Sequence, residues 1–225
     1  MRRSCACNRQ EIVGKMRKLW SQHVYWTRFF IISTAEELSD LKYVTNRLLE
    51  NPRDFAKVLK IFYCDKKADE FKKLLTEHLQ IAGDLVNADK DMNTAKADEL
   101  RKKWYANADD IAEFLSVINP YWCEQKWREM MYSHLSMTEK EAGFRLKKEY
   151  PKDIQMFESI EKEALEMGDY MASGIIRQFC CNRYAYIESL KMRLFFVAET
   201  EVDKNAKEKI RHMENSLCRK QHKYI

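Results

Sequence analysis

Residues 71–85 read Phe-Lys-Lys-Leu-Leu-Thr-Glu-His-Leu-Gln-Ile-Ala-Gly-Asp-Leu. Apolar residues in this segment recur at steps of three and four, so they line one side of a helix. These residues are Phe71, Leu74, Leu75, Ala82 and Leu85. His78 lies in the middle of that side, where a leucine would be expected. The segment therefore predicts an amphipathic helix that carries a histidine on its apolar face.

A second segment repeats this pattern. Residues 127–135 read Trp-Arg-Glu-Met-Met-Tyr-Ser-His-Leu, which aligns His134 with His78. An Asn-Pro pair precedes each segment, at residues 51–52 and at residues 119–120. We infer that the chain contains a duplicated helical unit.

The composition of the 225-residue chain favours helices throughout. It has five glycines and three prolines, too few for the turns of a many-stranded β fold. A domain of this length buries roughly 70% of its unfolded surface, so it can hold a core without disulfides. We predict an all-α fold: an up-and-down bundle of four or five helices with internal duplication, ferritin-like in outline.

We expect three parts along the chain. Residues 1–15 form a loose basic lead-in, residues 16–179 form the helical bundle, and residues 180–225 form a charged helical appendage. The first helix is predicted to begin near Gly14. The net charge of +5 resides in the two ends, so the body lacks the basic face that nucleic acid requires.

Local signals predict how several helices start and pack. Residues 33–37, Ser-Thr-Ala-Glu-Glu, are typical of a capping box that starts a second helix. Thr138 with Glu141 is a second candidate, which would break the helix that carries His134. Gly168 and Gly174 are expected to let a neighbouring helix approach closely.

The seven cysteines form an odd count without a regular framework spacing. The first residues lack the apolar core of a signal peptide, and apolar runs such as residues 29–32 are far shorter than the roughly 20 residues of a membrane span. We therefore expect free thiols, a cytoplasmic location and no membrane partner.

Each of four long predicted helices places one imidazole or amide near the middle of its apolar face. These residues are His23, His78, Asn107 and His134. Midpoints of antiparallel helices lie at similar heights in an up-and-down bundle, so the four side chains could meet in one layer.

This layer has two interpretations. It could bind a small ligand or a transition metal, because neutral imidazole suits iron, zinc, copper and nickel. Candidate carboxylate ligands are Glu77, Asp110, Glu113, Glu161 and Asp169. Alternatively, the layer is a hydrogen-bonded network that fixes helix register and binds nothing. The Glu-x-x-His pattern of di-iron bundles does not precede any of the three histidines.

Other chemistry finds little support. The five glycines form neither a phosphate-binding loop nor a Gly-x-Ser-x-Gly nucleophile turn. We therefore lean toward a non-enzymatic protein. The alternative from another class is an interaction module whose C-terminal appendage binds a protein partner or a second copy of the chain.

Four motifs together suggest a family. Residues 19–28 read Leu-Trp-Ser-Gln-His-Val-Tyr-Trp-Thr-Arg, and residues 76–79 read Thr-Glu-His-Leu. Residues 103–115 read Lys-Trp-Tyr-Ala-Asn-Ala-Asp-Asp-Ile-Ala-Glu-Phe-Leu, and residues 134–138 read His-Leu-Ser-Met-Thr. Across residues 16–179 the chain resembles small all-helical proteins of clostridia and related bacteria. Members often carry an automatic label of acetylglutamate kinase. True kinases of that name have an α/β fold with Gly-rich phosphate loops, so the resemblance implies the helical fold and no established activity.

Overall fold

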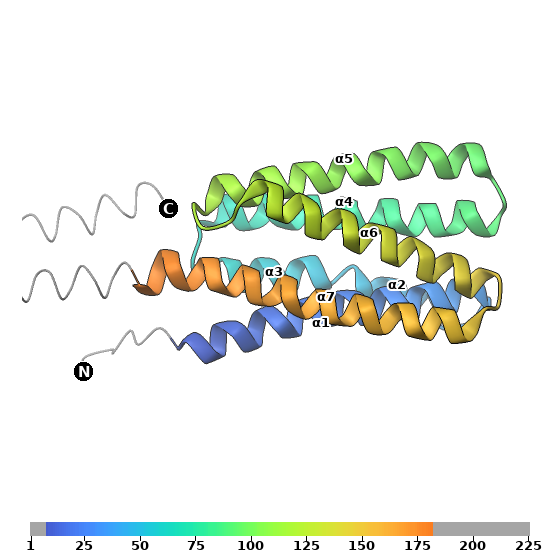
Figure 1. Ribbon diagram of the computed structural model, residues 1–225, viewed down its shortest axis with the longest axis horizontal. Coiled ribbons are helices and arrows are strands. Elements are labelled where there is room, and N and C mark those ends of the chain that lie inside the picture. The colour runs from blue at the N-terminus through green and yellow to red at the C-terminus, as the bar shows by residue number, and fades with distance from the viewer. Residues whose placement is uncertain (1–7, 182–225) are drawn as a thin grey trace, which may run out of the picture. The chain divides into compact units, whose positions relative to one another are not determined.

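The computed structural model describes residues 8–181, which form helices and no strand. The elements are α1 (Arg9–Ala35), α2 (Leu41–Leu48), α3 (Asn51–Leu59), α4 (Asp65–Lys90), α5 (Thr94–Ile118), α6 (Glu124–Leu146), α7 (Tyr150–Ile175) and a π-helical segment (Ile176–Cys181). The predicted all-α helical bundle is confirmed (Figure 1).

The helices pack in a closed ring. Helix α1 contacts α7, α7 contacts α6, α6 contacts α5, and α5 contacts α4. The short helices α2 and α3 complete the ring, since both contact α1 and α3 also contacts α4. Helices α1, α4 and α6 additionally contact one another, across the inside of this ring.

Helix α1 begins earlier than its sequence suggests. It starts at Arg9, because the side chain of Asn8 accepts a hydrogen bond from the backbone N–H of Glu11 at 3.2 Å. Such an N-cap satisfies one of the free N–H groups of the first turn. The predicted lead-in is therefore helical from residue 9 onward.

Two predicted helix starts are wrong. Ser33 lies inside α1, where it is buried and its hydroxyl donates to Asp40. Thr138 lies inside α6, which continues without a break. Glu141 does not cap that helix, because it is buried and accepts a hydrogen bond from Arg28. At Glu141 a tertiary contact has taken the side chain that the local pattern assigned to a cap.

An ion cluster joins α1, α6 and α7. The Arg28 guanidinium donates to Glu141 at 2.5 Å and to Asp153 at 2.6 Å, and Arg145 donates to Asp153 at 3.2 Å. Both carboxylates are almost fully buried, and burial raises the pKa of Glu141 to about 7. Removing one member would leave a buried charge without its partner, which typically costs about 3–5 kcal/mol.

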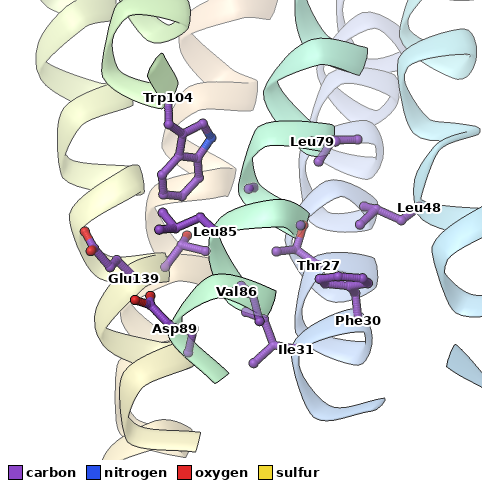
Figure 2. A pocket seen from close by; sticks show the side chains of 14 residues that line it. Thr27, Phe30, Ile31, Leu48, Leu79, Leu85, Val86, Asp89, Trp104 and Glu139 are labelled. Atoms are coloured by element: carbon purple, nitrogen blue, oxygen red, sulfur yellow. The ribbon is translucent and has the colours of Figure 1, made fainter. Parts of the chain in front are cut away.

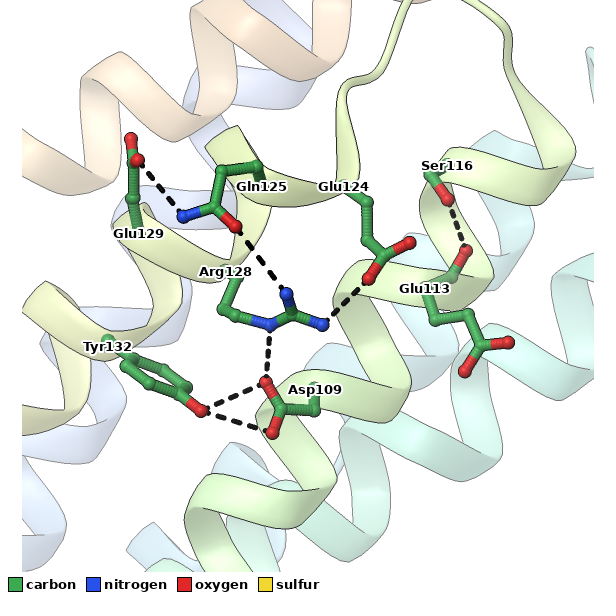
Figure 3. A network of polar contacts seen from close by, with 8 residues as sticks. All are labelled: Asp109, Glu113, Ser116, Glu124, Gln125, Arg128, Glu129 and Tyr132. Atoms are coloured by element: carbon green, nitrogen blue, oxygen red, sulfur yellow. Dashed lines mark hydrogen bonds and ion pairs between the residues drawn. The ribbon is translucent and has the colours of Figure 1, made fainter.

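A second polar network ties α5 to α6 at the surface (Figure 3). Asp109 accepts hydrogen bonds from Arg128 at 2.8 Å and from the Tyr132 hydroxyl at 3.0 Å, while Arg128 also donates to Glu124. Ion pairs this exposed contribute about 0–1 kcal/mol each. The network therefore orients the two helices more than it stabilises them.

Glycines allow close packing of α7, as predicted. A Cβ atom on Gly168 would lie 3.0 Å from the Cα atom of Arg17 in α1. A Cβ atom on Gly174 would lie 1.9 Å from Nε1 of the buried Trp122. A side chain at residue 174 would clash with Trp122, and one at residue 168 would push against the backbone of α1.

The ends of the chain and the cysteines complete the description. Contacts divide the chain into one unit up to Gln178 and another from Phe179. Most of the predicted appendage, residues 182–225, lies outside the described residues.

Cys64 and Cys123 are free thiols, whereas Cys180 is disulfide-bonded, so the expectation of free thiols does not hold at that position. No helix of residues 8–181 has the length and apolarity needed to cross a bilayer. The internal duplication stays a prediction.

We predict that Gly174→Ala destabilises the protein by about 1–3 kcal/mol, because the new methyl group overpacks against Trp122. The measurement is urea unfolding followed by circular dichroism. Gly143→Ala is the matched control, since nothing lies within 4 Å of its added Cβ atom. Its expected effect is a gain of up to about 1 kcal/mol from helix propensity. Equal stability of the two variants would contradict this packing.

Candidate metal centre

Three histidines meet at the centre of the bundle, and we call them the histidine triad. His23 comes from α1, His78 from α4 and His134 from α6. One ring nitrogen of each lies within 4.8 Å of the others. All three side chains are buried, and their ring centres are 5.6 to 6.5 Å apart. Such a group could hold a metal ion.

Asn107 of α5, the fourth member of the predicted layer, supports the triad from outside. Its Oδ1 atom lies 2.9 Å from Nδ1 of His78. Its Nδ2 atom donates to the backbone carbonyl of Leu74, one turn earlier in α4, at 3.2 Å. The amide is therefore oriented with its oxygen toward the imidazole.

Asn51 makes the same arrangement around His23. Its Oδ1 atom lies 3.1 Å from Nδ1 of His23, and its Nδ2 atom donates to the carbonyl of Leu19 at 3.0 Å. Sequence reasoning missed this residue, because the pair Asn51-Pro52 entered only as a marker of the repeat and not as a side chain facing the layer. The repeated Asn-Pro pair was the available signal. It does not suffice, because Asn119 instead bonds the Tyr63 hydroxyl at 2.9 Å.

The two amides fix the tautomers of two imidazoles. A carboxamide oxygen only accepts hydrogen bonds, so Nδ1 of His23 and Nδ1 of His78 must carry the proton. Nε2 of each ring then holds a lone pair and is the atom offered to a ligand. Fixing the far nitrogen of a metal-binding histidine in this way is the usual role of its outer hydrogen bond.

His134 differs from the other two histidines. Its Nδ1 atom is buried and has no hydrogen-bond partner. The third imidazole is therefore not fixed by an amide, and its protonated nitrogen is not determined by a neighbour.

The triad is uncharged at neutral pH. Burial lowers the pKa of His23 to about 4 and, with a further contribution from His23, that of His78 to about 3. Burial and the other two histidines lower the pKa of His134 well below its usual value. A neutral imidazole is the form that binds metal ions, so no proton needs to be displaced.

The spacing fits a metal ion after a small contraction. Zinc–nitrogen bonds of about 2.0–2.1 Å place the ligand atoms of a tetrahedral site about 3.4 Å apart. The three ring nitrogens lie within 4.8 Å of one another, so the rings must approach by at most about 1.4 Å.

The predicted carboxylates do not belong to this group. None of the five candidates is among the side chains that the structure brings together here. Glu77 is exposed, because it neighbours His78 in the helix and points about 100° away from it. Glu161 accepts a hydrogen bond from the Tyr25 hydroxyl at 2.6 Å. The candidate site consists of nitrogen ligands.

Aromatic rings surround the triad. The ring centre of Trp20 lies 5.6 Å from that of His23, and the ring centre of Trp104 lies 5.4 Å from that of His78. Both indoles are almost fully buried. The triad therefore lies in an apolar environment of low effective dielectric constant, which screens the charge of a bound ion only weakly.

Comparison with known proteins finds no match for this chain among family models, curated proteins or solved structures. The resemblance to clostridial helical proteins stays a prediction. The helices of residues 8–181 are unlike the α/β fold of acetylglutamate kinases. The histidine triad is therefore the feature that bears on function.

We predict that the metal-free protein loses stability as the pH falls from 6.5 toward 4. The unfolded chain has histidine pKa values near 6.5, whereas the pKa values of the triad are lower in the folded state. The unfolded state then binds more protons in this window, so stability is complete above pH 6.5 and declines below it.

The comparison is with His134→Leu, measured by urea unfolding at several pH values in the presence of a chelator. Removing one titrating histidine should reduce the slope of the free energy of unfolding against pH by up to about 1.4 kcal/mol per pH unit. Glu141 and Glu163, whose pKa values burial raises to about 7, oppose this trend, but they titrate in both proteins. Identical slopes would show that His134 is not a buried neutral base.

Proposed function

We propose that the histidine triad binds a divalent transition-metal ion, with zinc the best fit. One observation carries the proposal: three neutral imidazoles converge in the core, and two of them are fixed by Asn51 and Asn107 with Nε2 free to bind a ligand. Three histidines with one open position form a ligand set that zinc uses in proteins.

The proton count of the triad supports a ligand over a purely structural network. Three neutral rings carry three N–H groups, and two of these are donated to the amides of Asn51 and Asn107. The one remaining N–H, on His134, can serve a single acceptor within the triad. Among the triad's ring nitrogens, Nδ1 of His134 is buried without a hydrogen-bond partner, and a buried group left in that state costs about 1–3 kcal/mol. A metal ion bound by all three rings would use the lone pair that each neutral ring carries.

The ligand set also distinguishes among metals. Imidazole suits zinc, copper and nickel, whereas magnesium and calcium require oxygen ligands. The triad offers no oxygen. The proposal covers binding of the ion and includes no reaction. It describes the protein as a metal-binding helical bundle.

The competing proposal is a triad that only fixes helix register, in a bundle that acts as an interaction module. The amide contacts of His23 and His78 are compatible with this second proposal, since a purely structural network would show the same contacts. The two proposals differ in what happens when the imidazoles are removed.

We predict that the protein, produced without a His tag and dialysed against zinc, retains close to one zinc ion per chain. Elemental analysis measures the ratio, and His78→Ala should abolish retention. His212→Ala/His222→Ala is the control, because it removes the two histidines outside the triad and should leave the ratio unchanged. Zinc at 100 times its dissociation constant should raise the free energy of unfolding by about 2.7 kcal/mol.

The double variant His78→Leu/His134→Leu gives the deciding outcome. If the parent holds no zinc and the variant folds at least as stably, the triad is structural and the metal proposal is wrong. If the parent holds zinc and the variant does not, the register proposal alone is insufficient.

A further inference from the structure

A pocket that is open to solvent lies between α2 and α4, next to α1. Its volume is about 380 Å³, which is in the range of pockets that bind small organic molecules. Helix α2 packs on α1, and the pocket occupies the space between α2 and the neighbouring face of α4. None of the three histidines lines it, so the pocket is separate from the triad.

The base of the pocket is apolar. It is formed by the buried side chains of Phe30 from α1, Leu48 from α2 and Leu79 from α4. The same three residues also border a smaller cavity deeper in the bundle, and Figure 2 shows them on the side of that cavity away from Trp104. The inner cavity has a volume of about 20 Å³ and holds no more than one water-sized group. An organic ligand is therefore confined to the outer pocket.

A glycine in the wall of α4 enlarges the pocket. Gly83 lies in the interior of that helix, where glycine lowers the helix propensity. A Cβ atom at this position would lie 3.4 Å from Cζ of Phe30, which is van der Waals contact and not a clash. Packing therefore does not require glycine here, and the missing side chain leaves room beside the Phe30 ring.

Polar residues form the rim of the pocket. Gln80, Asp84 and Asn87 follow one another at steps of three and four residues, so they share one face of α4. Across the pocket, the Thr45 hydroxyl donates to the carbonyl of Leu41 at 2.7 Å, which leaves its oxygen as an acceptor. The carboxylate of Asp84 is exposed and has no ion-pair partner among the described residues.

The charge of the rim determines the class of ligand. Among the described side chains that line the pocket, Asp84 carries the one charge, and no basic side chain accompanies it. A cation is attracted to this carboxylate, and its N–H groups find acceptors on Asp84 and Thr45. The apolar base suits a hydrocarbon or aromatic group, which the Phe30 ring can contact edge to face.

We propose that this pocket binds a small amphipathic amine. The ammonium group lies at Asp84, and the apolar body lies against Phe30, Leu48 and Leu79. The proposal is independent of the metal site.

The test titrates phenethylamine into the isotope-labelled full chain, with a chelator present so that the amine cannot bind a metal ion. Two-dimensional NMR spectra report the backbone amides of Thr45 and Gly83, which lie on opposite sides of the pocket. We expect saturable shifts of both amides, with a dissociation constant on the order of 1 mM for a ligand of this size.

Two probes with the same phenylethyl skeleton isolate the role of charge. Phenethyl alcohol is neutral and should bind about fivefold more weakly, because it lacks the attraction to an exposed carboxylate. Hydrocinnamate carries a negative charge and should bind more weakly still.

Three variants place the amine in the pocket. Asp84→Asn removes the charge, keeps the shape, and should weaken phenethylamine binding about fivefold while leaving phenethyl alcohol unchanged. Asp110→Asn is the matched control, because it makes the same change at an exposed residue of α5 that does not line the pocket. Gly83→Leu fills the space beside Phe30 and should abolish binding of both probes. Circular dichroism checks that this last variant folds, and Asp84→Asn tests the site even where it does not.

Each contrary result overturns a defined part of the proposal. Absence of saturable shifts at Thr45 and Gly83 in the parent overturns the pocket as a binding site. Equal affinity for the three probes, or equal effects of Asp84→Asn and Asp110→Asn, overturns the assignment to an amine. A folded Gly83→Leu variant that still binds phenethylamine shows that the amine binds elsewhere. None of these measurements depends on zinc retention by the triad, so the metal site and the amine pocket are tested separately.

Discussion

Burial of three imidazoles in one layer is the constraint on which the rest of this bundle depends. A buried ring nitrogen is costly unless it finds a partner, and the protein provides two partners from outside the layer. Asn51 reaches His23 from α3, and Asn107 reaches His78 from α5. Each amide is itself anchored to a backbone carbonyl of the helix that carries its histidine. These hydrogen bonds link α3 to α1 and α5 to α4, while His134 of α6 contacts the other two rings by packing.

The remaining contacts hold the helices in the positions that this layer requires. Gly168 lets α7 approach the backbone of α1, and the buried cluster of Arg28, Glu141 and Asp153 joins α1, α6 and α7. Exposed ion pairs such as that between Arg128 and Asp109 add little free energy. Close packing and the buried charged cluster thus set the positions of the helices around the layer, and the exposed ion pairs contribute little to those positions.

The surroundings of the triad fix the direction of two of its rings and keep all three rings uncharged. The amides orient lone pairs toward the centre, and the depressed pKa values keep the rings neutral. The same low polarity that depresses these pKa values makes an uncompensated metal charge unfavourable.

The sequence by itself determined the helical fold and three members of the central layer. Spacing of three and four residues identifies the buried face of a helix, and His23, His78 and His134 interrupt that face at positions that the pattern makes visible. Asn107 was found for the same reason. Such signals are local, since they follow from the geometry of a single helix.

The tertiary structure decided what each polar residue does. Asn51 was missed because it lies on a short helix beside a proline, and its partner is 28 residues away. Glu141 was assigned to a cap because the sequence does not reveal Arg28 on another helix, with which it is paired. Carboxylates such as Glu77 and Glu161 stay out of the site because direction around a helix, and not nearness along the chain, places a side chain. Which buried groups meet depends on how the helices pack. The free energy of that packing comes from contacts between segments that are distant in the sequence.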